Sequence, residues 1–251
     1  MNDYLSKMFD LTGKVAVVTG GSRGLGYEMV KGFAAAGADV VIASRKLEAC
    51  ENVAREIEAM GRRALPLALH VARWNELDGF VEAVYAHFGK IDVLVNNAGL
   101  SPLAPSSVEV TEKLFDTIVG VNFKGPFRLA THIGSRMAAG AGGCIINISS
   151  GGALRPKPRF AVYSGAKAAL NTITEALAFE YGPKVRVNCI SAGPFTTDIA
   201  RDWTPEQKDR SHHALKRMGN PHEIVSTAIY LASDSASYTT GTLVRVDGGQ
   251  P

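Results

Sequence analysis

The sequence predicts an α/β protein with a doubly wound fold, in which about seven parallel strands form one sheet with helices on both faces. Three observations predict this class. Short apolar runs alternate with helix-patterned segments along the whole chain. The runs are apolar at consecutive positions, which is typical of strands buried on both faces. A glycine-rich turn joins the first apolar run to the first helical segment, which is the expected junction of a buried strand and a helix.

The strand predictions rest on short segments rich in Val, Ile and Leu that are bounded by turn-forming residues. The first, VAVV at 15–18, runs into three spaced glycines, and the second is DVVIAS at 39–44. The later strands follow the same pattern. The predicted strands are 15–18, 39–44, 64–69, 91–95, 144–148, 185–190 and 242–246.

The helix predictions rest on apolar residues that recur three and four positions apart. Gly61 is placed to end the helix at 45–60, and Thr111 is a suitable cap for a long helix that continues to residue 138. The polar stretch 196–220 lacks clear periodicity and is expected to be a mobile flap. The predicted helices are the segment after the glycine turn and 45–60, 75–88, 111–138, 161–181 and 221–232.

Composition indicates one globular domain over residues 1–251, because a chain of this length can bury one sizeable core. No apolar run reaches the roughly 20 residues that span a bilayer, so no membrane association is expected. A scattered net charge of +3 argues against a nucleic-acid partner. The amino-terminal segment lacks the apolar stretch of a secretory signal. Three cysteines without metal-ligand spacing predict buried thiols, no metal site and a cytoplasmic protein.

The loop after the first strand is suited to bind a phosphate. Gly20, Gly24 and Gly26 are spaced Gly-x-x-x-Gly-x-Gly at the start of the first helix. Glycine permits positive φ and close approach of a ligand to main-chain N–H groups. The amino end of a helix presents unpaired N–H donors and a partial positive charge, which stabilise an anion such as a pyrophosphate. Taken alone, this spacing is also compatible with a purely structural turn.

A candidate acid–base pair lies in the helix predicted at 161–181. Tyr163 and Lys167 are four residues apart and therefore share a helix face. A tyrosine with its ordinary pKa is a poor base at neutral pH, and a neighbouring ammonium is expected to lower that pKa toward the working range. Ser150, at the end of the fifth strand, can donate a hydrogen bond to a substrate oxygen. The alternative is an amphipathic helix that happens to hold these residues after a serine-containing turn.

Five motifs in order give the sequence a resemblance to a known family. They are 19–26 (TGGSRGLG), 96–99 (NNAG), Asn122, Ser150 and the Tyr163-x-x-x-Lys167 pair. Together they resemble the short-chain dehydrogenase/reductase superfamily, and the match covers nearly the whole chain. The resemblance implies a Rossmann fold, a nicotinamide cofactor and hydride transfer between that cofactor and a carbonyl or secondary alcohol.

The resemblance also implies a role for each residue of the site. Tyr163 would exchange a proton with the carbonyl or alcohol oxygen, while Lys167 would lower the pKa of Tyr163 and hydrogen-bond the nicotinamide ribose. Ser150 would orient and polarise the substrate oxygen. Asn122 would hold a water that relays protons to Lys167. An asparagine in mid-helix also predicts a local distortion, because its side chain competes with backbone hydrogen bonds.

Charge at the end of the second strand favours NADP over NAD. NAD-binding members carry an acidic residue there, whereas this chain has Ser44 followed by Arg45. With Arg23 in the glycine loop, two guanidinium groups are placed to bind a 2′-phosphate, and no carboxylate repels it. The cofactor contacts implied by the resemblance are Gly20, Ser22, Arg23, Gly24, Leu25, Gly26, Ser44, Arg45, His70, Val71, Asn97, Ala98, Gly99, Tyr163, Lys167, Gly193, Phe195 and Thr197.

The chain departs from the family pattern at two places. At 70–71 it has His-Val where the family has Asp-Val against the adenine. A neutral His offers one donor or one acceptor, so adenine binding is expected with altered geometry. At 192–194 it has Ala-Gly-Pro where the family has Pro-Gly, so the loop past the nicotinamide is expected to be less rigid. Phe195 and Thr197 would flank the nicotinamide amide.

The substrate is expected to contact the least patterned segments, which are the flap and the loops 100–110 and 151–159. The second loop contains Arg155, Lys157 and Arg159. These residues form either a solvated loop or subunit contact, or a clamp for an anionic substrate such as a carboxylate, phosphate or thioester carrier.

Three function classes remain open from the sequence. It resembles 3-oxoacyl-thioester reductases and polyol, sugar or other secondary-alcohol dehydrogenases equally. A cofactor-binding sensor without turnover is a further alternative, against which the intact catalytic residues argue. Because the family is usually tetrameric, through the helices at 111–138 and 161–181 and the last strand, a homotetramer is expected.

Overall fold

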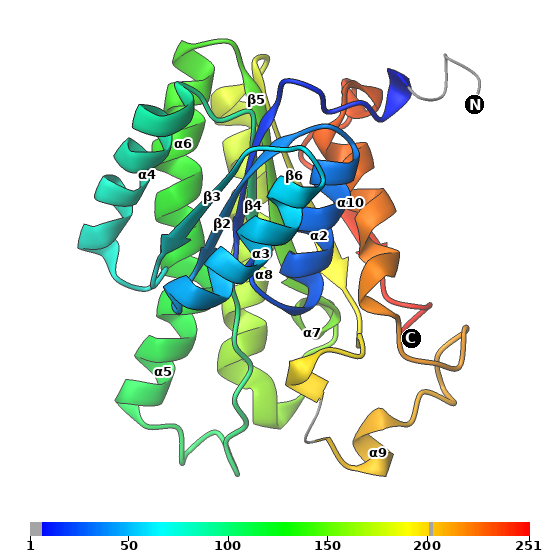
Figure 1. The fold of residues 1–251 in the computed structure, drawn as a ribbon. Coiled ribbons are helices and arrows are strands. Elements are labelled where there is room, and N and C mark those ends of the chain that lie inside the picture. Colours follow the sequence, from blue (N-terminus) through cyan, green and yellow to red (C-terminus); the bar gives the residue numbers. More distant parts are fainter. Residues whose placement is uncertain (1–6, 201–202) are drawn as a thin grey trace.

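Seven parallel strands form the predicted sheet in the order β3-β2-β1-β4-β5-β6-β7 (Figure 1). The computed structural model describes residues 7–200 and 203–251. The strand order reverses between β1 and β4, and ligands bind beyond the carboxyl ends of strands at such a point. The strands are β1 (Val15–Thr19), β2 (Asp39–Ser44), β3 (Ala64–Ala68), β4 (Val93–Asn96), β5 (Gly143–Ser150), β6 (Val185–Ala192) and β7 (Leu243–Val246).

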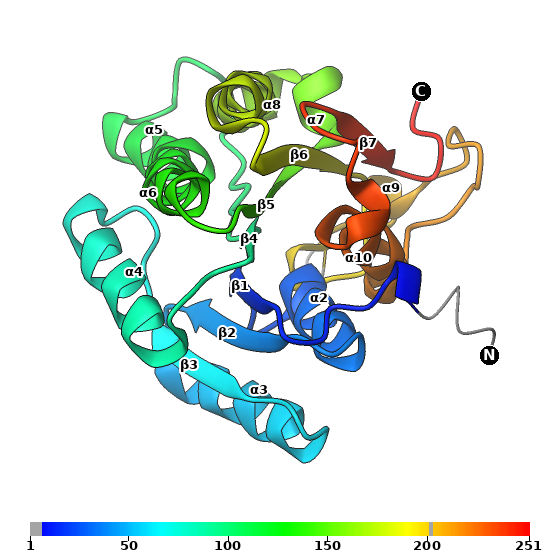
Figure 2. The ribbon, with the colours of Figure 1, turned by 90° about the horizontal axis from the view of Figure 1, so that it is seen from above.

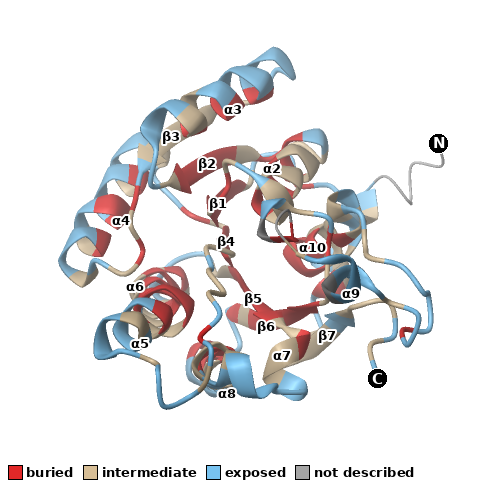
Figure 3. Ribbon diagram, turned by 90° about the horizontal axis from the view of Figure 1, so that it is seen from below, coloured by how far each residue is buried: buried red, intermediate tan, exposed pale blue. Residues whose placement is uncertain are grey.

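Helices cover both faces of the sheet and bury an apolar layer on each (Figures 2 and 3). Phe33 on one face and Ile133 on the other are fully buried, and each such side chain contributes about 1.5–3 kcal/mol relative to an exposed one. One face is covered by α2 (Gly24–Ala35), α3 (Leu47–Ala59) and α10 (Val225–Ala232), and the other by α4 (Trp74–Phe88), α6 (Gly125–Ala139) and α8 (Ala161–Tyr181).

Two central strands extend beyond the apolar runs that predicted them. β5 continues to Ser150 and β6 to Ala192, and these two residues are register partners. Ser149 and Ser191 also pair in the ladder and are buried. The extension places the Ser150 side chain at the carboxyl edge of the sheet.

The long helix predicted at 111–138 consists of three segments. The Thr111 hydroxyl caps α5 (Glu112–Val119) by accepting from Leu114 N at 3.2 Å. A π-helical turn, Gly120–Lys124, then leads into α6. This turn confirms the distortion that Asn122 predicts.

The loops predicted as irregular contain short helices. The loop after β5 holds α7 (Gly151–Leu154) and a 3-10 turn, and the flap holds α9 (Pro205–Lys208) and another 3-10 turn. The base of the flap is pinned because Gly219 N donates to Pro194 O at 3.0 Å and Thr196 N donates to Gly219 O at 2.9 Å. The segment expected as a flap thus contains short helical turns, and its mobility stays a prediction. Too few residues form each turn for a periodic pattern to show in the sequence.

Candidate active site

The glycine loop is shaped by packing as well as by backbone conformation. Gly20 and Gly24 have φ of +67° and +56°, which favours glycine. A Cβ on Gly26 would lie 2.2 Å from Gly20 O, and a Cβ on Gly20 would lie 2.9 Å from Asn97 Nδ2. Gly20 and Gly26 are thus required for the loop to close on itself, whereas Gly24 has open space around it apart from Thr197 at 3.5 Å.

The amino end of α2 fits the pyrophosphate of a dinucleotide. Arg23 precedes the helix in an extended conformation and provides no side-chain cap, and the first turn contains no acidic residue. Leu25 and Gly26 lie in that first turn, where N–H groups lack partners within the helix. The first main-chain bond comes from Tyr27 N to Arg23 O. These N–H groups and the helix dipole would hold the diphosphate.

Thr19 connects the ends of β1 and β4. Its hydroxyl donates to Val95 O at 3.2 Å and accepts from Asn97 N at 3.0 Å and Ala98 N at 3.1 Å. Asn97 Nδ2 donates a hydrogen bond to Thr19 O at 2.9 Å. Sequence reasoning assigned no role to Thr19, although its position directly before the loop was the available signal. Asn97 and Ala98 therefore support the glycine loop from the neighbouring strand.

The predicted 2′-phosphate site is basic and contains no carboxylate at the end of β2. The Ser22 hydroxyl donates to Ser44 Oγ at 2.9 Å, which joins the loop to β2. Arg45 is exposed, and its side chain has no hydrogen bond or ion pair with the described residues. Arg23 Nη1 lies 3.4 Å from Asp198 Oδ2 of the flap. Both ends of this pair are exposed, so it contributes little to stability.

At the adenine position His70 is turned toward its own backbone. Its Nδ1 accepts from Ala72 N at 3.4 Å, which leaves Nε2 as the free ring nitrogen. Val71 is buried, and its carbonyl lies against Gly125. A ligand can therefore meet His70, while the Val71 side chain belongs to the core.

Ser150 and Tyr163 lie side by side at the edge of the sheet. Ser150 Oγ accepts from Gly152 N at 3.1 Å, so its own proton is free to be donated elsewhere. A Cβ on Gly152 would lie 3.5 Å from Ser150 Oγ and 3.8 Å from Tyr163 Cε1. Gly152, which sequence reasoning overlooked in the Gly-Gly after Ser150, therefore keeps the space beside both groups clear.

The electrostatics of Tyr163 differ from the expectation. Burial raises the pKa of the phenol above its ordinary value, and the hydrogen bond with Ser150 lowers it only in part. Lys167 is buried, and its Nζ donates to Ile148 O at 2.7 Å. The expected lowering of the Tyr163 pKa by Lys167 is therefore wrong for this arrangement, because the ammonium is held by a carbonyl and burial dominates.

Burial also changes the titration of Lys167 itself. It lowers the pKa of the ammonium from 10.5 to about 8, and the nearby Cys189 thiol acts weakly in the opposite direction. A lysine with this pKa exchanges a proton close to neutral pH. Strongly shifted groups of this kind cluster at functional sites.

Asn122 fixes the loop after β4 to the π-helical turn. Its Nδ2 donates to Ile118 O and Leu100 O, both at 2.9 Å, and its Oδ1 accepts from Leu100 N at 3.3 Å. A Cβ on Gly99 would lie 3.1 Å from Asn122 Oδ1 and 3.7 Å from Lys167 Nζ. The absence of that Cβ leaves room between the amide and the ammonium for a small ligand or water.

The loop after β6 is held from two directions. Gly193 N donates to Val246 O at 2.9 Å, and a Cβ on Gly193 would lie 2.5 Å from Asp247 Cα. The Phe195 ring is buried and packs against Gly219. Thr197 lies over the glycine loop, whereas the Phe195 ring faces the core, so only the backbone of Phe195 can meet a cofactor there.

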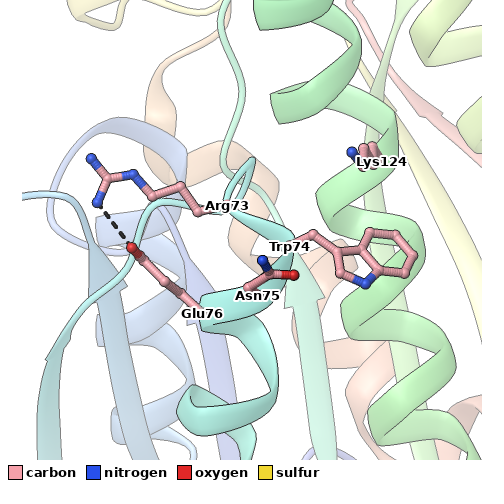
Figure 4. Close-up of a pocket in the computed structure, with 5 residues that line it drawn as sticks. All are labelled: Arg73, Trp74, Asn75, Glu76 and Lys124. Atoms are coloured by element: carbon pink, nitrogen blue, oxygen red, sulfur yellow. Dashed lines mark hydrogen bonds and ion pairs between the residues drawn. The ribbon is translucent and has the colours of Figure 1, made fainter.

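A separate hollow of about 650 Å³ lies at the amino end of α4 (Figure 4). Arg73 pairs there with Glu76 at 3.0 Å, and the Trp74 ring lies 5.7 Å from Lys124 Nζ. None of the predicted site residues lines it. We assign it no catalytic role.

The fold and the groups gathered at its carboxyl edge define a Rossmann-type oxidoreductase that uses a nicotinamide cofactor. The sequence model of the family described as enoyl-(acyl carrier protein) reductase matches residues 20–250. The chain belongs to the short-chain dehydrogenase/reductase family and acts on CH–OH or C=O groups.

Two relatives illustrate the breadth of the family. The short chain dehydrogenase/reductase astE of Aspergillus oryzae is 36% identical over 250 residues, with 96% of each chain covered. The 3-oxoacyl-(acyl-carrier-protein) reductase of Chlamydia trachomatis is 35% identical over 243 residues, with 95% of this chain and 98% of the relative covered.

Two solved structures show the same fold with cofactor bound. A gluconate 5-dehydrogenase from Burkholderia cenocepacia in complex with NADP and tartrate has a TM-score of 0.92 at 30% identity, with 98% of each chain covered. A 7α-hydroxysteroid dehydrogenase complexed with NADH has a TM-score of 0.92 at 32% identity, with 97% of this chain and 96% of that chain covered. Relatives of similar fold thus differ in the cofactor they hold.

Within the described residues, no helix combines the length and apolar character needed to cross a membrane. The same residues contain no cluster of three or more His, Cys, Asp or Glu side chains arranged to hold a metal ion.

Replacing Lys167 by Met is expected to stabilise the folded protein by on the order of 1 kcal/mol at pH 7, because it removes a buried ammonium. In the wild type the pKa falls from 10.5 to about 8 on folding. The folded state therefore carries the full penalty below pH 8, and the penalty fades as the pH rises toward 10.5. Denaturant unfolding of both proteins at pH 7 and at pH 10 checks this. A difference that stays constant or grows at pH 10 contradicts it.

Proposed function

We propose that the chain is an NADP-dependent oxidoreductase that transfers a hydride between the nicotinamide and a carbonyl or secondary alcohol, with Tyr163 as the acid/base. The observation that supports the proposal is that Tyr163 and Ser150 lie together beside Gly152, while Lys167 lies one helical turn along α8 and donates to Ile148 O near the end of β5. Tyr163 would supply a proton and Ser150 a hydrogen-bond donor at one point, with a titratable cation one turn away.

The residues support a simple division of work. When bound, the reduced nicotinamide supplies the hydride, and Gly20, Gly24, Ser22 and the amino end of α2 would hold its diphosphate. The Ser150 hydroxyl would donate a hydrogen bond to the substrate carbonyl oxygen, keeping its own proton, and so polarise the carbonyl. Tyr163 gives that oxygen the proton that completes the alcohol. A phenol with a raised pKa keeps this proton at neutral pH, which suits the reductive direction.

Lys167 and Asn122 would restore the proton of Tyr163. Lys167 titrates near pH 8, so it can release and regain a proton under ordinary conditions. Asn122 uses both of its amide hydrogens on carbonyls, and its oxygen, which accepts from Leu100 N, lies beside Gly99 with room for a second donor. We expect a water in this space to connect Asn122 with Lys167.

The basic groups at the end of β2 support NADP over NAD. A free guanidinium at Arg45 and the absence of a carboxylate at Ser44 suit a 2′-phosphate. The relative that holds NADH shows that the fold itself does not impose this choice.

Two substrate classes are supported by named relatives. The 35% identical reductase of Chlamydia trachomatis favours a 3-oxoacyl thioester, and the gluconate 5-dehydrogenase favours a polyol or sugar acid. Oxidation of NADPH in the presence of an acetoacetyl thioester and a panel of ketones tests the proposal. Turnover supports an enzyme, and the better substrate selects the class. NADPH binding without turnover over a wide panel favours a cofactor-binding sensor instead.

We also propose a cytoplasmic homotetramer. Phe179 on α8 is 89% exposed and Phe115 on α5 is also exposed, so the helices expected at the subunit contacts carry uncovered aromatic side chains. Sedimentation equilibrium checks the assembly, and a monomeric mass contradicts it.

Reversing the charge of Arg155 is expected to raise the KM of anionic substrates about tenfold and to leave neutral ketones unchanged. The Arg155 and Lys157 side chains are exposed and have no partner among the described residues, whereas Arg159 Nε donates to Ala104 O at 3.3 Å. Arg155→Glu therefore tests the anion clamp without breaking a contact. KM values for an anionic and a neutral ketone at low salt decide it, and equal effects on both contradict it.

A further inference from the structure

The amide of Gln250 occupies the place of the side chain that Gly151 lacks. A Cβ on Gly151 would lie 2.3 Å from Gln250 Oε1 and 3.1 Å from Gln250 Cδ. Gly151 is buried and directly follows Ser150. Consequently a residue from beyond β7 provides a polar group to the wall of the site beside Ser150.

A turn centred on Asp247 holds Gln250 in this place. Asp247 Oδ1 accepts from Gly249 N at 3.0 Å and from Gln250 N at 3.4 Å. Arg245 Nε donates to Asp247 Oδ2 at 2.8 Å, and Arg245 Nη2 donates to Gln250 O at 2.5 Å. The Asp247 side chain is only 6% exposed, so solvent and salt screen this ion pair less than one at the open surface.

The same turn is joined to the loop that follows β6. Gly193 packs against Asp247, and Leu215 N of the flap donates to Gly248 O at 3.0 Å. Gln250 is therefore anchored to two of the segments that surround the site. Its backbone is fixed by these contacts.

The amide of Gln250 forms no hydrogen bond with any described residue. It is half-buried and offers two donors and one acceptor. Gly152, the next residue of the same short helix, faces Ser150 and Tyr163. An unpaired amide that packs against Gly151, between Ser150 and Gly152 in the chain, is suited to recognise a hydroxyl, which both donates and accepts.

We propose that Gln250 is a specificity-determining residue that hydrogen-bonds a hydroxyl of the substrate close to the reacting carbon. The enzyme then prefers hydroxylated carbonyl compounds to analogues in which a methyl group replaces that hydroxyl. This inference rests on the proposed oxidoreductase function. It assigns Gln250 to binding and not to the proton transfer.

The test compares hydroxyacetone with butanone, which differ by one hydroxyl in place of a methyl group. Gln250→Met keeps the length of the side chain and removes its hydrogen bonds. We expect kcat/KM for hydroxyacetone to fall about fivefold to tenfold, through KM, with butanone changed by less than about twofold. Gly151→Ala should give the same selective loss, because its methyl group would displace the amide.

Gly79→Ala is the matched control, because a Cβ on Gly79 meets nothing within 4 Å and this residue lies in α4. Equal losses on both ketones would assign Gln250 a structural role and overturn the inference, as would an unchanged hydroxyacetone preference in Gln250→Met. If the wild type binds NADPH but reduces no ketone in a wide panel, the proposed function fails and the inference falls with it. Turnover of either ketone by the wild type shows that the proposed function holds, so a failure of the Gln250 inference can then be recognised separately.

Discussion

Replacing Tyr163 by Phe is expected to lower kcat about 100- to 10,000-fold while NADPH still binds, because the phenol is the group proposed to deliver the proton. The substitution removes one oxygen and leaves the ring, which faces Gly152. Ser150 retains its bond from Gly152 N and can still polarise the carbonyl. Steady-state rates of NADPH oxidation and a fluorescence titration of NADPH binding measure the two effects separately.

Tyr181→Phe is the control for this substitution. Tyr181 lies at the end of the same helix, and its hydroxyl donates to Thr131 O at 3.3 Å, away from the site. This variant should lose some stability and keep its turnover. A Tyr163→Phe enzyme that retains more than a tenth of the wild-type kcat would show that another group supplies the proton, and the acid/base role would have to be withdrawn.

The sequence predicted the elements best where apolar continuity or helical spacing was unbroken. The second strand, 39–44, and the helix 161–181 agree with β2 and α8 at both ends. The fifth and sixth strands were predicted too short because the apolar run stops at a serine, Ser149 in one strand and Ser191 in the other. Ser149 and Ser191 pair across the sheet, and only the neighbouring strand shows that such residues belong to the ladder.

The site residues were easier to identify than their electrostatics. Spacing placed Tyr163 and Lys167 on one helix face, and the structure has them there. The direction of the Tyr163 pKa depends on how deeply the phenol is buried and on the bond between Lys167 and Ile148 O. Both are properties of packing between distant segments, which a four-residue spacing does not contain.

Long-range contacts also explain the remaining differences. The Phe195 ring faces the core because Gly219 leaves space for it. Gln250 reaches Gly151 from the far end of the chain. Neither contact can be predicted from the residues next to it in the sequence, since each joins segments that only the strand order brings together. Motifs therefore predicted the candidate reacting groups, while the residues that surround them became visible only in the structure.

Replacing Arg45 by Asp is expected to lower the ratio of NADPH to NADH affinity about tenfold to a hundredfold. The change removes a free guanidinium from the end of β2 and introduces a carboxylate that repels a 2′-phosphate and accepts from ribose hydroxyls. Because Arg45 is exposed and has no partner among the described residues, its loss should not disturb the fold. Dissociation constants for both cofactors, measured at one ionic strength, give the ratio.

Lys90→Asp provides a control for net charge, since it makes the same change just before β4 begins, at the opposite end of the sheet. Because it also breaks the pair of Lys90 with Asp92 at 3.0 Å, its folding is checked by denaturant unfolding. It should leave the cofactor ratio unchanged. If Arg45→Asp also leaves the ratio of NADPH to NADH affinity unchanged, the end of β2 does not bind the 2′-phosphate, and the NADP assignment is wrong. A partial effect would indicate that Arg23 also binds the 2′-phosphate. In that case the phosphate competes with Asp198 for the Arg23 guanidinium. The double variant Arg23→Ala/Arg45→Asp would lose the remaining preference in that case.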